Sequence, residues 1–338
     1  MKKKGKMFGA VAAALVCAAV ALPSCGSGDK NASAKAEVES KDAGGAPGGP
    51  RLGTPGGGPV IDKTGDSVLQ DMIKKLVPRF EQLEYADSVT GKTLKYNLFT
   101  PKNAAGSKKL PLVLFMADAS TPGADFVRPL TQGYGALVWA TDEWQKAHPC
   151  YILVPQFSGV AVNDAYEHTE EVDAVIRLLN GIVADRGIDR QRLYTTGQSM
   201  GGMISMYYNI RYPSVFAASL FVDCHWDMAF ADELVRHKFT FVTAGDAGKS
   251  FADIKAIEKA AERDAIKYEY AQWSAKLPQN EQDSLASAML GKGAPVNIIN
   301  FTPKSVLPAD GKGSEHMYSF DYAYKLTPVR EWLFNQSR

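Results

Sequence analysis

The stretch Leu193-Tyr194-Thr195-Thr196-Gly197-Gln198-Ser199-Met200-Gly201-Gly202 decides the fold of this chain. Residues 193–196 are predicted to form a buried strand, and residues 203–212 have the apolar spacing of a helix. A G-x-S-x-G motif between a strand and a helix predicts a sharp turn that exposes the hydroxyl of Ser199. Its glycines let the two backbones pass closely. We therefore expect Ser199 to be a nucleophile rather than an ordinary turn serine.

Strands and helices alternate on both sides of this turn. Nearly continuous apolar runs, typical of parallel strands buried on both faces, occupy residues 110–116, 151–155, 193–196, 218–222, 239–243 and 296–301. Helical spacing of apolar residues occurs at 66–76, 170–183, 203–212, 254–265, 281–290 and 329–334. Two earlier strands, 80–86 and 93–99, are joined through Val89-Thr90-Gly91-Lys92, a hairpin signal. The order predicts an α/β fold, with a mostly parallel sheet, helices on both faces and an N-terminal antiparallel hairpin.

The N-terminus has the pattern of an export signal. Residues 1–7 are basic, and residues 8–22 are apolar but shorter than the roughly 20 residues that span a bilayer. The sequence Leu22-Pro23-Ser24-Cys25-Gly26 is similar to a bacterial lipoprotein cleavage box, although its proline is unusual. We expect a lipid on Cys25; an ordinary signal peptide with an incidental cysteine is the alternative.

Three segments follow from this pattern. We predict a lipoprotein signal peptide over residues 1–24, a flexible Gly/Pro-rich tether over 25–65 and a catalytic domain over 66–338. The protein is then expected to be exported and lipid-anchored to a bacterial membrane, either periplasmic or at the cell surface.

Composition and missing motifs narrow the function further. The chain has 38 Lys and Arg against 37 Asp and Glu, so its bulk charge does not suggest a nucleic-acid partner. We predict no disulfide between Cys150 and Cys224, which belong to opposite ends of parallel strands. No sequence pattern for a metal or nucleotide site is present, so we expect neither a metal nor a cofactor. The pattern does not predict the oligomeric state.

A nucleophilic serine needs a base, and the base needs an orienting carboxylate. Functional groups of a parallel sheet gather at the carboxyl ends of the strands. His148 and His237 precede predicted strands, whereas His168, His225 and His316 follow strands. Because the usual chain order is serine, acid, histidine, we expect His316 to be the base.

Two aspartates compete for the role of the acid. Asp246 comes directly after the run 239–243 and is the expected acid. Asp223 ends the preceding strand and is the rival. Both lie between Ser199 and His316 in the chain, as the order requires.

The elbow resembles that of the α/β-hydrolase superfamily, and the resemblance extends from about Leu94 to the C-terminus. The segments that are similar to secreted bacterial esterases of the polyhydroxybutyrate-depolymerase, feruloyl-esterase and prolyl-oligopeptidase-like group are Leu112–Met116, Trp144–Gln156 and Tyr212–Ala218. The resemblance implies a serine hydrolase acting on a small-molecule or polymer ester, with Ser199 as nucleophile, Asp246 as acid and His316 as base.

The oxyanion loop departs from that resemblance. Such enzymes usually carry His-Gly after the third strand, where this chain has Ala117-Asp118-Ala119-Ser120. We expect one oxyanion donor to be the N–H of Met200 and the second to come from Ala117 or Asp118. A carboxylate near an oxyanion opposes catalysis. Asp118 is therefore expected to turn outward, to bind a substrate cation or to mark an altered chemistry.

Two further features concern the approach to the site. Residues 250–295 are longer than the usual connection between acid and histidine, and form either a lid or an elaboration of the sheet edge. The aromatic residues expected near the mouth are Trp139, Trp144, Trp226 and Tyr318. We expect His225 and Trp226 to line the substrate pocket, with simple core packing as the alternative.

Three functions are compatible with these patterns. The first is hydrolysis of carboxylic esters through an acyl-enzyme, which the order of serine, acid and histidine favours. The second is a serine peptidase acting on short peptides, which the same three residues would serve. The third is a non-catalytic, lipid-tethered protein that binds a saccharide or polymer, which the altered Ala117-Asp118 pair favours.

Overall fold

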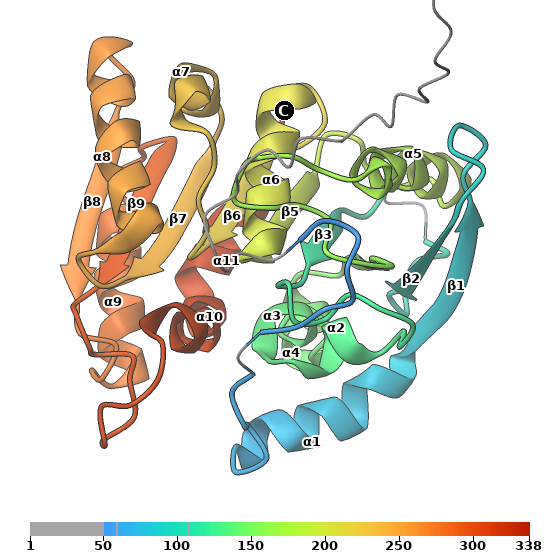
Figure 1. Ribbon diagram of the computed structural model, residues 1–338, viewed down its shortest axis with the longest axis horizontal. Helices are drawn as coiled ribbons and strands as arrows, with labels where there is room; N and C mark the ends of the chain where they lie inside the picture. Colours follow the sequence, from blue (N-terminus) through green and yellow to red (C-terminus); the bar gives the residue numbers. More distant parts are fainter. Residues whose placement is uncertain (1–50, 59, 107–108) are drawn as a thin grey trace, which may run out of the picture. The chain divides into compact units, whose positions relative to one another are not determined.

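Nine strands form one sheet in the computed structural model, which describes residues 51–338 apart from 59, 107 and 108 (Figure 1). The strand order is β1-β2-β4-β3-β5-β6-β7-β9-β8. β2 is antiparallel to both β1 and β4, and all other neighbours are parallel. The bounds are β1 Phe80–Ala86, β2 Thr93–Phe99, β3 Leu112–Met116, β4 Tyr151–Gln156, β5 Leu193–Gln198, β6 Ala218–Val222, β7 Phe239–Ala244, β8 Tyr268–Trp273 and β9 Val296–Phe301. The predicted mostly parallel sheet with an N-terminal antiparallel hairpin is confirmed.

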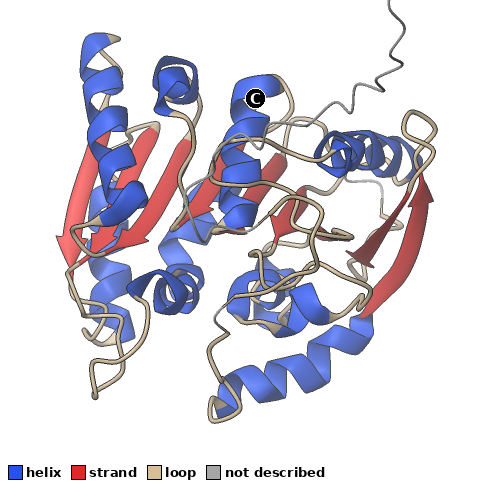
Figure 2. Cartoon of the chain, viewed as in Figure 1, coloured by secondary structure: helices blue, strands red, loops and turns tan. Residues whose placement is uncertain are grey.

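Helices cover both faces of this sheet (Figure 2). One face packs against α5 Glu170–Asp185, α6 Met200–Arg211, α7 Ala231–Leu234 and α8 Gly248–Arg263. The other face packs against α1 Ser67–Leu76, α2 Arg128–Thr131, α3 Tyr134–Leu137, α4 Asp142–Ala147, α9 Gln279–Leu290, α10 Glu315–Lys325 and α11 Thr327–Phe334. Short 3₁₀ turns lie at Val77–Arg79 and Met228–Phe230.

The central strands are buried on both sides, which explains their apolar runs. In β3, Leu112, Leu114 and Met116 join the core under α5 and α6. Val113 and Phe115 point the opposite way and join the core under α10 and α11. Alternate residues of a strand face opposite sides of a sheet, so a fully apolar sequence is what two covered faces require.

The segment between β7 and β9 settles one open alternative. Residues 250–295 form most of α8, then β8 and α9, and β8 pairs with β9 at the edge of the sheet. Of the two alternatives, the elaboration of the sheet edge is therefore the one that the structure contains. The first turn of α8 borders a pocket, which Gly248, Lys249 and Ser250 help to line.

Several expectations fall on the N-terminus. The signal peptide over 1–24, Cys25 and most of the tether lie outside the described residues. Within the described part of the tether, residues 51–58 make backbone hydrogen bonds to the loops after β3 and β4, contacts that the expected flexible tether did not include. Among the residues that the structure describes, no helix has the length and apolar character needed to cross a bilayer.

Candidate active site

Ser199 lies on a strained turn between β5 and α6. Its φ of 50° and ψ of −121° are unusual for a residue with a side chain. A Cβ on Gly197 would collide with the backbone of Gly201, and a Cβ on Gly201 would collide with the backbone of Met116. Both glycines are therefore needed because strand, helix and the end of β3 approach closely. The turn has the conformation that the G-x-S-x-G motif predicts.

His316 reaches this serine from α10. Its Nε2 lies 2.9 Å from Oγ of Ser199, although 117 residues separate the two in sequence. His316 is the second residue of α10, a helix that the sequence analysis did not predict. The imidazole is 39% exposed, so it faces both the serine and the solvent side of the cleft.

The carboxylate beside His316 is that of Asp223 and not that of Asp246. Asp223 Oδ1 lies 3.5 Å from Nδ1 of His316, and its side chain is 4% exposed. The contact is longer than an ordinary hydrogen bond. Asp246 follows the neighbouring strand β7 and is exposed at the pocket rim. The expectation that Asp246 orients His316 is corrected by this placement.

A buried hydroxyl holds Asp223 from the other side. Ser319 Oγ lies 2.9 Å from Asp223 Oδ2 and 2.8 Å from the carbonyl oxygen of His316. Ser319 is one turn beyond His316 on α10, so the helix contacts the carboxylate at two points. Asp223 itself has a φ of 35°, a strained value that turns its side chain from the end of β6 toward α10.

The charges around His316 favour its protonated form. Burial lowers the pKa of the imidazole, but the hydrogen bond and the negative charge of Asp223 raise it more. The more distant carboxylates of Asp118 and Asp164 act in the same direction. The net result is a His316 pKa above the ordinary histidine value. An imidazole of this kind is a stronger base than histidine in water.

Asp118 does not point into the cleft. Its side chain is buried, Oδ1 accepts a hydrogen bond of 2.8 Å from the N–H of Ser120, and Oδ2 accepts one of 3.0 Å from the amide of Gln198. The buried position differs from the outward one that was among the expectations. The carboxylate instead joins the loop after β3 to the residue before Ser199.

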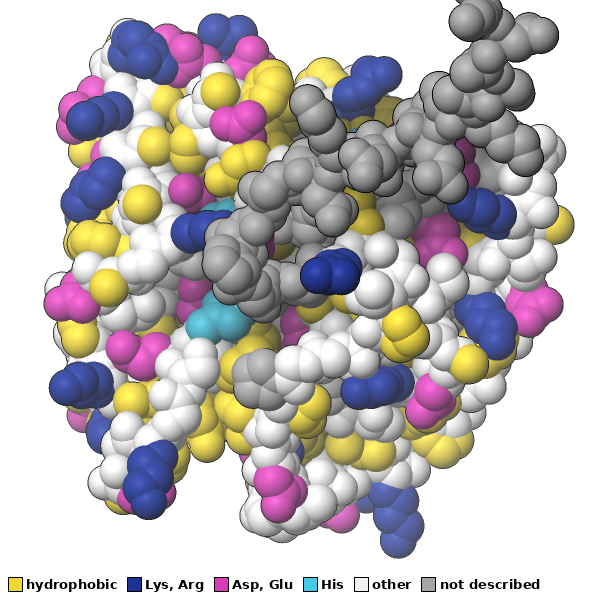
Figure 3. Space-filling view, in the orientation of Figure 1, with side chains coloured by type: hydrophobic (Ala, Val, Ile, Leu, Met, Phe, Trp, Pro, Cys, Tyr) yellow, Lys and Arg dark blue, Asp and Glu magenta, His cyan; other side chains and the backbone are white. Residues whose placement is uncertain are grey.

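The cleft contains Ala119 rather than Ala117 or Asp118. A pocket of about 590 Å³ is lined by Ser199, His316, Met200, Ala119 and Asp223, among others. Ala117 and Asp118 are both buried and are not among its lining residues. Figure 3 shows histidine side chains near the middle of one face, with acidic and basic side chains close by.

The wall of the pocket beyond His316 is polar. His225 Nε2 lies 3.2 Å from Asp164 Oδ1, and Lys249 Nζ lies 3.0 Å from Asp164 Oδ2. Burial lowers the pKa of His225, with the nearby Lys249 charge acting in the same direction. His225 is among the residues that line the pocket, as expected.

Trp226 does not line the pocket, which corrects that part of the expectation. Its side chain is buried, and its ring packs against Tyr166 and Tyr207 with centroid distances of 5.6 and 5.7 Å. The backbone N–H of Trp226 donates to Asp253 Oδ2 at 2.9 Å. Burial raises the pKa of Asp253 to about 7. The tryptophan thus packs in the core beneath the loop that carries Asp223 and His225.

Comparisons with known proteins support the same architecture. The family model described as Esterase PHB depolymerase matches residues 94–244. A crystal structure of a thermostable esterase superimposes with a TM-score of 0.63 and 23% identity, covering 78% of this chain and 64% of that chain. The chain has an α/β-hydrolase fold. The expected resemblance to esterases of this superfamily is confirmed.

Other comparisons add less. A ferulic acid esterase superimposes with a TM-score of 0.48 and 14% identity, covering 75% of this chain and 98% of that one. No curated protein matches the chain. This chain spans just under two thirds of the length of the thermostable esterase. The likeness to the thermostable esterase therefore supports the α/β-hydrolase fold.

Trp139 and Trp144 lie away from the mouth of the cleft. Both are buried in the core, where the guanidinium carbon of Arg330 lies 5.9 Å from the Trp139 ring centroid and 4.8 Å from that of Trp144. Tyr318 contacts the glycine-rich loop before α10, because a Cβ on Gly313 would lie 2.6 Å from its ring. Of the four expected mouth aromatics, the three tryptophans at 139, 144 and 226 pack in the core.

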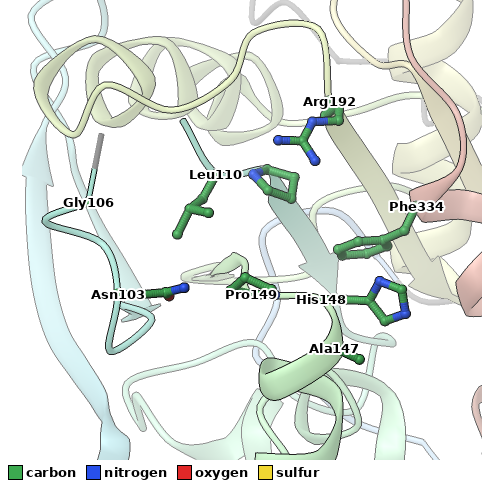
Figure 4. A pocket seen from close by; sticks show the side chains of 9 residues that line it. Asn103, Gly106, Leu110, Ala147, His148, Pro149, Arg192 and Phe334 are labelled. Atoms are coloured by element: carbon green, nitrogen blue, oxygen red, sulfur yellow. The ribbon is translucent and has the colours of Figure 1, made fainter. Parts of the chain in front are cut away.

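A second pocket of about 540 Å³ lies at the opposite end of the sheet (Figure 4). His148 and Arg192, which precede β4 and β5, line it together with Phe334. Arg192 is already bound to Asp189 Oδ2 at 2.8 Å and to the carbonyl of Lys109 at 2.9 Å. His148 lies here, as its position before a strand predicts, and far along the strands from Ser199.

The described residues include two of the cysteines and side chains that could bind a metal. Cys150 and Cys224 are both buried and free, as expected from their places at opposite strand ends. Within the described ranges, no cluster of three His, Cys, Asp or Glu side chains has the arrangement of a metal site.

Proposed function

We propose that this α/β-hydrolase is a serine hydrolase of carboxylic esters. The observation that supports the proposal most directly is the 2.9 Å contact between Nε2 of His316 and Oγ of Ser199 on a strained elbow. A serine hydroxyl becomes nucleophilic when a neighbouring base accepts its proton. The match to the esterase family model over residues 94–244 favours esters over amides.

The chemistry has two steps. Ser199 Oγ attacks the ester carbonyl carbon while its proton passes to Nε2 of His316, and the imidazolium then protonates the departing alcohol. An acyl-enzyme remains on Ser199. Water attacks this ester with His316 again accepting a proton, which returns to the serine as the carboxylic acid leaves. Asp223 holds the imidazole through Nδ1 in both steps.

We assign the oxyanion hole to the N–H groups of Met200 and Ala119. Met200 is the first residue of α6, so its N–H has no partner within the helix. The carbonyl of Asp118 accepts hydrogen bonds from the N–H and hydroxyl of Thr121. Because C=O and N–H of a trans peptide point in opposite directions, the N–H of Ala119 is directed away from Thr121. Ala119 also lines the pocket, which supports this choice over Ala117 or Asp118.

A substitution of the serine tests the proposal. We expect p-nitrophenyl acetate to be hydrolysed by the wild type, and kcat of Ser199→Ala to be lower by at least about 10³-fold. Ser250→Ala is the matched control, because Ser250 also lines the pocket but lies at the start of α8. Equal hydrolysis by wild type and Ser199→Ala would reject the proposal.

The N-terminal pattern adds a proposal about location. A lipid on Cys25 would anchor the exported protein to a bacterial membrane, outside the cytoplasm. In a cell fractionation experiment, the wild type is then expected in the membrane fraction and labelled by radioactive palmitate, whereas Cys25→Ala is expected to be unlabelled. A Cys17→Ala variant is the control, since that cysteine lies within the apolar run.

A further inference from the structure

Residues 51–58 cross the loops that follow β3 and β4. Their backbone is bound to these loops at both ends of the segment. The hydrogen bonds, with donors first, are Gly53 N to Val160 O at 2.9 Å, Val160 N to Thr54 O at 2.8 Å, Gly56 N to Pro122 O at 2.9 Å and Gly57 N to Ala119 O at 3.1 Å. The segment therefore pairs with two loops that are far from it in sequence. We call residues 51–58 the strap.

The strap touches the loop after β3 without space for a side chain. A Cβ on Gly56 would lie 2.7 Å from both the nitrogen of Pro122 and the carbonyl oxygen of Ser120. Real Cβ atoms do not approach so closely, so a side chain here would push the strap away. A Cβ on the next residue, Gly57, would meet nothing within 4 Å. The two adjacent glycines thus differ sharply in their surroundings.

The loop under the strap contains the proposed second oxyanion donor. The strap residue Gly57 holds the carbonyl of Ala119, and Asp118 Oδ1 holds the N–H of Ser120 at 2.8 Å. These two bonds fix the orientation of the peptide that follows Ala119. Thr121 fixes the peptide that precedes Ala119, since its N–H and hydroxyl bind the carbonyl of Asp118. The direction of the Ala119 N–H depends on both.

We propose that the strap is a positioning element of the active site, which holds the peptides around Ala119 so that its N–H faces the oxyanion. This inference rests on the proposed function. It assigns a catalytic consequence to a segment whose sequence has the composition of a linker. The Gly57 bond acts at the carbonyl of the donor residue itself, which is why a small displacement of the strap changes the oxyanion hole before it changes the rest of the fold.

The test compares Gly56→Ala with Gly65→Ala in the full-length protein. We expect Gly56→Ala to lower kcat for p-nitrophenyl acetate by about 10- to 100-fold, because loss of one oxyanion donor costs about 10²–10³ in rate and a misplaced one costs less. KM and the unfolding temperature are expected to stay close to the wild-type values. Gly65→Ala, which lies outside the strap, is expected to leave kcat within about twofold, since an added Cβ there meets open space.

A second variant tests the strap at its other end. A Cβ on Gly159 would lie 2.5 Å from the carbonyl oxygen of Gly53, so Gly159→Ala displaces the other end of the strap. We expect the same pattern, a lower kcat at an unchanged KM. If kcat of both Gly56→Ala and Gly159→Ala equals the wild-type value, or falls only in proportion to the folded fraction, the strap has no catalytic role.

Labelling with a fluorophosphonate separates this inference from the function on which it rests. A wild type that is labelled at Ser199, with Gly56→Ala labelled more slowly, supports both. A labelled wild type with equally fast labelling of Gly56→Ala overturns the strap alone. An unlabelled wild type overturns the proposed function, and the strap with it.

Discussion

The carboxylate of Asp223 lies 3.5 Å from Nδ1 of His316 and comes from β6, the strand directly beside the one that carries Ser199. Asp246, at the end of β7, lies one strand farther away and is exposed. The ends of neighbouring parallel strands are about 5 Å apart. An aspartate side chain is too short to make up this extra distance to the imidazole. The position of the histidine on α10 therefore determines which strand end supplies the acid.

Substitution of the two aspartates should separate their roles. We expect Asp223→Asn to lower kcat by about 10³- to 10⁴-fold, because an amide next to Nδ1 favours the wrong tautomer of His316. Asp246→Asn should change kcat by no more than about threefold. Both are measured as steady-state hydrolysis of p-nitrophenyl acetate at one pH. A large loss in Asp246→Asn with little loss in Asp223→Asn would contradict the arrangement.

The raised pKa of His316 has a kinetic signature. The imidazole must be neutral to accept the serine proton, so kcat/KM should rise with pH through a midpoint above the ordinary value of about 6.5. Replacing Asp223 by Asn removes the interactions that raise the pKa, and the remaining activity should then rise at a lower pH than in the wild type. The pH profile of Asp246→Asn should coincide with that of the wild type. An unshifted midpoint in Asp223→Asn would show that another group controls the titration.

Ser319 is expected to support the acid. Removing its hydroxyl in Ser319→Ala leaves one oxygen of the buried Asp223 without its partner at 2.9 Å. A lost hydrogen bond to a charged group costs about 1–2 kcal/mol, so we expect kcat to fall about tenfold with KM nearly unchanged. Ser205→Ala removes a buried hydroxyl that binds Thr195 and Gly201 instead, and it should leave kcat within about twofold. Equal losses in both variants would mean that the effect is on folding.

A charge pair outside the site should contribute to stability. Arg177 Nε and a terminal nitrogen bind the two oxygens of Asp87 at 2.7 and 2.8 Å, which joins the β1–β2 turn to α5. The Arg177 guanidinium holds the pKa of Asp87 well below its usual range. We expect Arg177→Met to lower the free energy of unfolding by about 2 kcal/mol, because Asp87 stays buried without a counter-charge.

Urea unfolding at neutral pH measures this effect. Lys92→Met is the matched control, since Lys92 pairs with Glu170 where both side chains are more than half exposed. Its unfolding midpoint should stay close to that of the wild type. A midpoint of Arg177→Met that equals that of Lys92→Met would show that the buried pair adds no stability.

Much of the sheet could be predicted. The predicted bounds 80–86, 93–99, 218–222 and 296–301 agree with β1, β2, β6 and β9. The apolar runs of β6 and β9 reflect burial on both faces, whereas β1 and β2 are marked by the turn between them. The strained conformation of Ser199 follows from the same local pattern, since the two glycines admit the close approach of strand and helix.

Helix α10 could not be predicted in the same way. Its sequence, EHMYSFDYAYK, is rich in aromatic residues that favour strands, and its helical state depends on packing of Phe320, Ala323 and Tyr324 into the core. Because the placement of His316 depends on this helix, the sequence left two acids open, and the choice of Asp246 was wrong. Ser319 and Ala119 were missed for the same reason, since only tertiary contacts distinguish them from other small residues.

The place of the carboxylate on β6 has a consequence for how such a protein can diversify. In the proposed mechanism the turn that contains Gly245 and Asp246 takes no part in proton transfer, although it borders the cleft. Substitutions in this turn can therefore change which substrates enter the cleft while Ser199, His316 and Asp223 stay in place. Evolution, or an engineer, would find its safest route to new selectivity at the tip of β7.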